Sequence, residues 1–293
     1  MIPSRLDIAF AADFLARRGL GDGPYRIKKL TGGYWNDVLK VSNPSGTYVV
    51  KCYRAVLKDS LFPNLPFAEA AALQRLSGLG VAPEPIAFWP DDGILVYSYI
   101  EGKIWQDDVI GMANLLRRKE AADAQGFRAV PITIEGILVE GDALFARCKV
   151  DKLITAIKKY RPSSFATPTP DRLSLIHTDI GATNLIGHGD GLRLIDWQCP
   201  AMGDIAEDIY SFLSPAFQIL NRCQPLTEKV CGQFFDALDM PRSKQRYYDL
   251  APAYAYRMAG YCCLRYQTVD ESDVVVRDRY IRAAEAELER IKG

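Results

Sequence analysis

Residues 173–197, LSLIHTDIGATNLIGHGDGLRLIDW, constrain the fold of this chain more than any other segment. The apolar runs NLIGH and LRLIDW flank a Gly-Asp-Gly turn, which is typical of a short β-hairpin that follows a polar loop. Asp179 lies in that loop, Asn184 follows five residues later, and Asp196 ends the second run. A hard divalent cation prefers carboxylate and amide oxygens, so Asn184 and Asp196 are predicted to hold Mg²⁺ from both sides of the hairpin. Asp179 is then free to contact a nucleophile.

Length and charge narrow the class of protein. A chain of 293 residues, 48% of them hydrophobic and 25% charged, can bury a large core in one domain or two lobes. The 36 Lys and Arg residues balance 36 Asp and Glu residues. This balance argues against a nucleic-acid partner and favours a small molecule.

No apolar stretch has the length of a membrane span, so we expect neither membrane anchoring nor export. The seven cysteines include the adjacent pair Cys262 and Cys263, and we expect reduced thiols in a cytoplasmic protein. Only two histidines are present and no C-x-x-C accompanies them, which argues against a zinc site.

The first hundred residues are predicted to form an antiparallel sheet with one main helix. Residues 25–53 alternate in a way typical of a three-strand meander, and residues 66–79 carry apolar side chains at helical spacing. The segment FWPDDGILVYSYIEG predicts two further strands. Composition changes after Glu101, so a boundary is predicted between an N-terminal lobe of residues 1–101 and a C-terminal lobe of residues 102–293.

The C-terminal lobe is predicted to be mostly helical, which makes the fold class α+β. Residues 108–125 and 142–161 have helical patterns, whereas the segment VPITIEGI between them has no clear assignment. From Asp204 to the end the pattern is helical, with breaks near 214–215, 224–225 and 239–241. The basic run LLRRKE at 115–120 is predicted to be a solvated helix face.

Two motifs resemble those of the kinase superfamily. The spacing of His177, Asp179 and Asn184 resembles its H-x-D-x-x-x-x-N loop, in which the Asp orients or deprotonates the accepting hydroxyl. The block LIDWQCPAMGDIAEDIY, with Asp196, Gly203, Asp204 and Asp208, is similar to the aminoglycoside phosphotransferase and choline kinase-like family. The joint pattern is specific, although either half alone would be weak.

This resemblance implies a two-lobed protein-kinase-like fold that uses ATP and Mg²⁺. Gly32 and Gly33 lie between the first two strands, where missing side chains allow close backbone approach to phosphates. The resemblance also implies that Lys51 pairs with Glu69 and faces the phosphates, and that adenine binds the Ser98 carbonyl and the Ile100 amide in LVYSYIEG.

The chain departs from its relatives at two positions of these motifs. Thr178 stands where relatives usually carry Gly, Asn or Ala, and Gln198 stands where many choline kinase relatives have Glu. Because Gln198 replaces this Glu, the hypothesis that a cationic substrate is held at this position becomes weaker. The loop IGATN also lacks the His-Pro common in the family. None of these changes removes a catalytic group.

Several polar and aromatic residues admit a structural and a functional interpretation. The nearest candidates in sequence for the acceptor pocket are Gln198, Asp204, Glu207 and Tyr210. Asp204 and Asp208 also suit the capping of a helix N-terminus. His177 is expected to support the loop through hydrogen bonds to the backbone, and the tyrosines at 254, 256, 261 and 266 are expected to belong to the core.

The predicted activity is transfer of the ATP γ-phosphoryl group to a hydroxyl of a small molecule. Choline, ethanolamine, thiamine, another amino alcohol, a sugar or an aminoglycoside all remain possible acceptors. A protein kinase is the alternative enzyme, but only six residues separate Asp196 from Gly203, which leaves no room for an activation segment. A nucleotide-binding pseudokinase is the non-enzymatic alternative. Oligomeric state, pathway and preference for ATP over GTP are not indicated.

Overall fold

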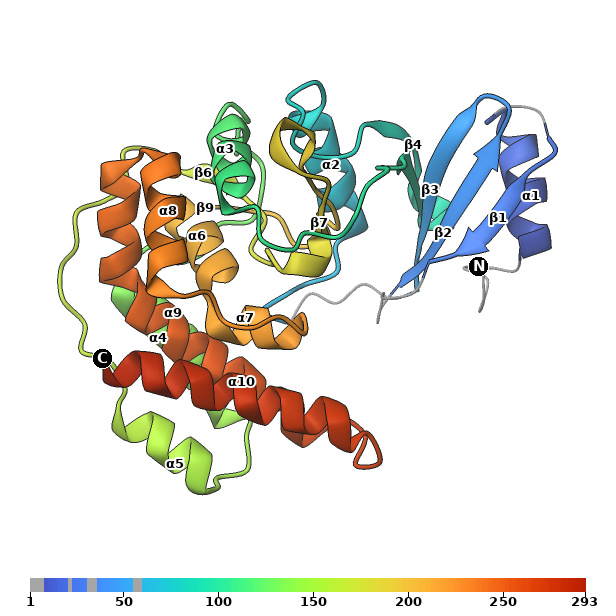
Figure 1. Ribbon diagram of the computed structural model, residues 1–293. Helices are drawn as coiled ribbons and strands as arrows, with labels where there is room; N and C mark the ends of the chain where they lie inside the picture. The colour runs from blue at the N-terminus through green and yellow to red at the C-terminus, as the bar shows by residue number, and fades with distance from the viewer. Residues whose placement is uncertain (1–7, 21–22, 31–35, 55–59) are drawn as a thin grey trace.

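The computed structural model describes residues 8–20, 23–30, 36–54 and 60–293. Its N-terminal part is a five-stranded sheet in which every neighbouring pair of strands is antiparallel, in the order β1-β2-β3-β5-β4 (Figure 1). The strands are β1 (Arg26–Lys29), β2 (Asn36–Asn43), β3 (Gly46–Tyr53), β4 (Pro85–Trp89) and β5 (Ile94–Ser98). The predicted meander and the two later strands are therefore confirmed.

Each face of this sheet packs against one helix. Alternate side chains of the strands, such as Leu39, Val50 and Val96, form an apolar cluster with α1 (Ile8–Arg17). The side chains between them, such as Val49 and Leu95, belong to the main core together with α2 (Pro66–Leu76). Because side chains alternate across a strand, Lys51 faces the α2 side of the sheet, two residues after Val49.

Two pairs of short strands follow in the C-terminal lobe. Strand β6 (Ser174–Ile176) pairs with β9 (Ala201–Gly203), and β7 (Leu185–Ile186) pairs with β8 (Arg193–Leu194). A 3₁₀ turn over Gly189–Gly191 joins β7 to β8, which confirms the predicted hairpin. A second 3₁₀ turn, Ala182–Asn184, leads into β7.

Eight helices of the described residues build the C-terminal lobe (Figure 1). They are α3 (Val109–Lys119), α4 (Ile134–Ala146), α5 (Lys152–Lys159), α6 (Ile205–Leu213), α7 (Pro215–Leu220), α8 (Glu228–Leu238), α9 (Pro241–Thr268) and α10 (Val274–Lys292). None of the helices in the described ranges combines the length and the apolar character needed to cross a membrane. The predicted breaks near 214, 225 and 240 are confirmed.

The prediction of one helix over 142–161 is wrong. Thr133 caps α4 by accepting a hydrogen bond from the Gly136 amide, so this helix begins in the unassigned segment VPITIEGI. Asp151 caps the separate helix α5 by accepting from the Ile154 amide at 2.9 Å. Each cap satisfies amides that the first turn of a helix leaves unpaired, which fixes where each helix begins.

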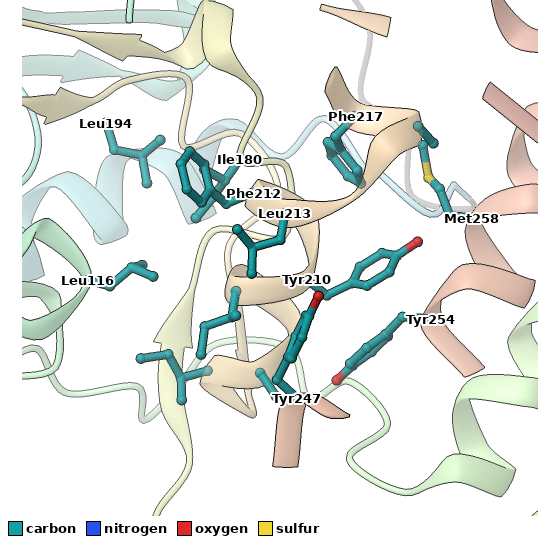
Figure 2. Close-up of a cluster of buried hydrophobic side chains, with 14 of the residues drawn as sticks. Leu116, Ile180, Leu194, Tyr210, Phe212, Leu213, Phe217, Tyr247, Tyr254 and Met258 are labelled. Carbon is teal, nitrogen blue, oxygen red and sulfur yellow. The ribbon is translucent and has the colours of Figure 1, made fainter. Parts of the chain in front are cut away.

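The core of this lobe is rich in aromatic side chains. Figure 2 shows Tyr210 and Tyr254 close together beside Phe217 and Met258. The Tyr210 and Tyr254 rings lie 5.2 Å apart. The side chains of Tyr254, Tyr256 and Tyr266 are buried and that of Tyr261 is partly buried, which confirms the expected core role of these tyrosines. All seven cysteines are free thiols, as expected.

Candidate active site

A buried lysine joins the two lobes. The ammonium of Lys51, on β3, lies 2.6 Å from a Glu69 carboxylate oxygen on α2 and 2.5 Å from an Asp196 oxygen after β8. The side chains of Lys51 and Glu69 are only 2% and 1% exposed, whereas that of Asp196 is 35% exposed. The Tyr53 hydroxyl also donates to Glu69. The structure thus brings together three of the predicted site residues.

Two carboxylates keep the Lys51 ammonium charged. Burial opposes the charged form, but the negative charges of Asp196 and Glu69 outweigh it and raise the pKa of Lys51 well above its ordinary value. A permanently charged, fixed ammonium suits the neutralisation of phosphate oxygens. Glu69 and Tyr53 fix it in place from the N-terminal lobe.

The loop between β6 and β7 is organised by His177. Its Nδ1 accepts a hydrogen bond from the Asp179 amide at 3.2 Å, and its Nε2 lies 3.0 Å from the Ile195 carbonyl oxygen. These partners fit the neutral tautomer protonated at Nε2, and burial lowers the pKa of the ring. The expected structural role of His177 is therefore confirmed.

Thr178 has a backbone conformation that is unusual for a β-branched residue. Its φ is +69°, in the left-handed region that Gly and Asn adopt more easily than a β-branched residue. The Thr178 hydroxyl donates to the Cys199 carbonyl at 3.0 Å, and its amide donates to Asp208 at 2.9 Å. These two bonds hold the loop in the conformation from which Asp179 projects.

The carboxylate of Asp179 accepts no hydrogen bond from the described residues and is half-buried. Burial, and next the negative charge of Asp196, raise the pKa of the Asp179 carboxyl to about 7. A carboxylate without a protein partner, with a pKa near neutrality, can accept a hydrogen bond from a bound hydroxyl and take its proton.

Asn184 and Asp196 lie side by side. The Ile195 amide donates to the Asn184 backbone carbonyl at 2.8 Å, which places Asp196 next to Asn184. The Asn184 amide nitrogen donates to the Asp179 carbonyl at 3.0 Å, so its side-chain oxygen is left for another partner. Asp196 itself has a φ of +64°. Two oxygen donors, one from a carboxylate and one from an amide, fit Mg²⁺, which takes one or two protein ligands and completes its shell with phosphate and water.

The predicted adenine contacts lie at and just after the end of β5, an inner strand of the sheet. Gly32 and Gly33 lie outside the described residues. Ser98 ends β5 opposite Tyr48, and the partly exposed Ile100 follows it at the start of the link between the lobes. The roles of Ser98 and Ile100 in binding adenine stay predictions.

The four candidate acceptor residues occupy three different surroundings. Gln198 is 8% exposed and ties the lobes together, since its side-chain oxygen accepts from Asn36 at 3.2 Å. Asp204 is 1% exposed, caps α6 through the Ala206 amide, and pairs with Arg246 at 2.6 Å. The capping interpretation of Asp204 is confirmed, and its contact with an acceptor stays a prediction.

Glu207 and Tyr210 border a small cavity beside Thr178, one residue before Asp179. Glu207 is 3% exposed and pairs with Arg257 at 2.6 Å, yet its second carboxylate oxygen is buried without a hydrogen-bond partner. Tyr210 is 2% exposed and packs in the core. A cavity of about 520 Å³ elsewhere in this lobe is lined by Asp204 and Arg246 but by none of Lys51, Asp179, Asn184 and Asp196.

Sequence patterns missed three buried cations of this lobe. Arg246 pairs with Asp204 and Arg257 pairs with Glu207. The paired residues are 42 and 50 positions apart in the sequence, so no local pattern predicts these ion pairs. Lys119 is 1% exposed, so the prediction that the run LLRRKE is a solvated face is wrong at this residue. Its neighbours Leu115 and Leu116 are also buried.

The fold and the site together define a two-lobed kinase-like phosphotransferase architecture. The model of the phosphotransferase enzyme family, APH, matches residues 26–250, so the chain belongs to this family. A thiamine kinase of Escherichia coli O17:K52:H18 is 31% identical over 160 residues, and one of Escherichia coli O157:H7 is 27% identical over 162 residues. Each alignment covers 53% of this chain and 57% of the relative, so the chain spans little more than half the length of these curated relatives.

Solved structures show the same fold over nearly the whole chain. A protein from Ralstonia eutropha JMP134 described as an aminoglycoside phosphotransferase superposes with a TM-score of 0.71 and 15% identity, covering 98% of this chain and 99% of its own. The choline kinase LicA from Streptococcus pneumoniae gives a TM-score of 0.64 and 15% identity, with coverage of 96% and 98%. The predicted kinase-like fold class is therefore confirmed.

Proposed function

We propose that the protein is an ATP- and Mg²⁺-dependent kinase that phosphorylates a hydroxyl of a small molecule. The observation that carries this proposal is the arrangement of Lys51, Asp179, Asn184 and Asp196 around one point between the lobes. Two solved relatives in complex with ADP, a spectinomycin phosphotransferase and an aminoglycoside phosphotransferase, support nucleotide use. Residues 1–101 would bind the nucleotide and residues 102–293 the acceptor.

Each residue has a distinct role in this proposal. Lys51, fixed by Glu69, neutralises phosphate oxygens, and Asn184 and Asp196 hold Mg²⁺, which supplies further neutralisation of charge when bound. Asp179 accepts the proton of the acceptor hydroxyl and orients its oxygen towards the γ-phosphorus. The phosphoryl group passes directly to the acceptor, without a covalent enzyme intermediate.

The acceptor hydroxyl must lie about 2.6–3.2 Å from the Asp179 carboxylate, on the side away from the nucleotide. We place part of the wall of such a pocket at the small cavity beside Thr178, which is lined by Phe62 of the N-terminal lobe as well as by Phe217 and Glu207 of the C-terminal lobe. Thiamine is the first acceptor to test, because the curated relatives are thiamine kinases. Choline, ethanolamine, sugars and aminoglycosides form the rest of the panel. We place the reaction in the cytosol, where ATP is present and the free cysteines stay reduced.

The experiment is a screen for ADP release with purified protein, MgATP and this panel of hydroxyl compounds. The expected result is release of ADP that depends on one acceptor class, with the phosphorylated product identified by mass spectrometry. An Asp179→Asn variant serves as the matched control, since it should bind MgATP but not turn over. A protein that binds MgATP and transfers phosphate to no acceptor would favour the pseudokinase alternative.

A further inference from the structure

Lys119, in the last turn of α3, is a cation that is fully enclosed by protein. Its ammonium donates to the Leu175 carbonyl at 2.7 Å, in the strand that leads into the catalytic loop. It also lies 3.2 Å from Glu120 and 3.3 Å from Asp208, and the Lys119 and Asp208 side chains are both 0% exposed. A buried ammonium needs partners of this kind because its desolvation is costly.

Asp208 is the direct anchor of the catalytic loop. Its Oδ1 accepts the amides of His177 and Thr178, both at 2.9 Å, and its Oδ2 accepts the His177 amide at 3.1 Å. Hydrogen bonds to a carboxylate are stronger than those between neutral groups. This anchor therefore helps to hold Thr178 at its φ of +69°, one residue before Asp179.

Lys119 supplies the counter-charge of Asp208. Among the described residues, Lys119 is the one cation within ion-pair distance of Asp208. Glu120 shares the Lys119 ammonium through its Oε1, whereas its Oε2 accepts from Ser174 at 2.7 Å and from Arg172 at 3.0 Å. Without the ammonium, Asp208 would be a buried carboxylate with no counter-charge, and its hold on the two loop amides would weaken.

We propose that Lys119 is a positioning residue for phosphoryl transfer, which acts on Asp179 through Asp208 and the amides of His177 and Thr178. The proposal rests on the catalytic role of Asp179 proposed above. A merely structural ion pair would stabilise the lobe without affecting turnover. A positioning residue fixes where the Asp179 carboxylate meets the acceptor hydroxyl, so its loss lowers kcat and leaves nucleotide affinity nearly unchanged.

The test is Lys119→Met, which keeps the length and apolar stem of the side chain but removes its charge. We expect kcat to fall roughly 10- to 100-fold, because small displacements of a catalytic group have effects of this size. KM for ATP should stay within about threefold, since Lys51 and Asp196 are untouched. Lys119→Gln, which keeps a donor for Leu175, is the second variant should Lys119→Met fail to fold.

Leu238→Ala is the matched control, because Leu238 is a fully buried residue of the same lobe that is not part of the loop anchor. It should lower the melting temperature by a similar amount while kcat stays within about twofold of wild type. In an Asp208→Asn background, Lys119→Met should add less than about twofold to the loss of kcat, since both changes break one connection.

Two results would overturn the proposal: an unchanged kcat in both Lys119 variants, or losses from Lys119→Met and Asp208→Asn that simply multiply. Failure of the proposed function is a different outcome, since the wild type itself would then release no ADP. In that case the positioning claim can still be tested by amide hydrogen exchange of the peptide over 175–181, because this measurement needs no turnover. There the positioning claim predicts faster exchange in Lys119→Met than in Leu238→Ala, and equal exchange would refute it.

Discussion

Replacement of Asp179 by Asn should inactivate the enzyme and stabilise the ligand-free protein. The carboxylate lacks a hydrogen-bond donor among the described residues, and burial, followed by the charge of Asp196, raises its pKa to about 7. An amide of the same shape removes the ionised form that this environment disfavours. The two effects have opposite signs, which distinguishes a catalytic carboxylate from one that supports the fold.

The size of the stabilisation follows from the pKa. The change from 3.8 to about 7 corresponds to a ceiling of roughly 4 kcal/mol, at about 1.4 kcal/mol per pH unit. Because water reaches the half-buried carboxylate, we expect about 2 kcal/mol, or a melting temperature higher by about 4–8 °C. A pKa raised in the folded state means that the stabilising proton is fully bound below about pH 4 and lost as pH rises through about 7. The advantage of Asn should therefore be small at about pH 4 and largest at about pH 8.

The assay combines thermal unfolding at both pH values with turnover and MgATP binding. Turnover should fall about 10²- to 10⁴-fold, as is typical when a positioned base is removed, while MgATP affinity stays close to that of wild type. Asp190→Asn is the control, since the Asp190 side chain is fully exposed in the turn of the neighbouring hairpin and should show neither effect. Wild-type turnover on the true acceptor, or equal stability gains at both pH values, would refute this role of Asp179.

Three further predictions concern the rest of the site. Asp196→Ala and Asn184→Ala should each weaken MgATP binding, with the larger effect for Asp196, and a titration showing unchanged affinity and Mg²⁺ dependence in both would contradict the metal site. Glu69→Ala should lower the free energy of unfolding by about 3–5 kcal/mol, because it removes a fully buried partner of Lys51; urea denaturation measures this, and a loss below about 1 kcal/mol would show that the pair is dispensable. Glu207→Gln should raise KM for the acceptor more than KM for ATP, and steady-state kinetics with the reverse pattern would place the pocket elsewhere.

Local patterns were sufficient to predict the parts of the fold that depend on local chemistry. The meander, α2 and the β7–β8 hairpin follow from side-chain periodicity and turn residues, and the spacing from Asp179 to Asp196 places the polar groups of the site. The true ends of α4 and α5 could not be predicted, because they depend on the capping bonds of Thr133 and Asp151. Without these caps, the spacing of apolar residues over 142–161 is also compatible with a single longer helix.

Long-range pairing explains what the sequence pattern missed in the site. Lys119 lies in a charged run that would suit a solvated helix face, and only the fold brings Asp208, 89 residues later, to its ammonium. The surroundings of Gln198 likewise depend on its contact with Asn36 of β2, and those of Glu207 and Tyr210 depend on how α6 packs against α9. For this reason the sequence locates the transferring groups better than it locates the acceptor pocket.

Because Lys51 contacts both Glu69 and Asp196, the protein itself supplies a counter-ion to these two carboxylates. One ammonium contacts carboxylates from both lobes, Glu69 on α2 and Asp196 after β8. A ligand that draws Lys51 towards its own anionic groups would release Asp196 at the same moment, so one movement would expose a carboxylate and supply a cation. Binding of such a ligand would therefore require Lys51 to exchange partners and would not create a bare charge.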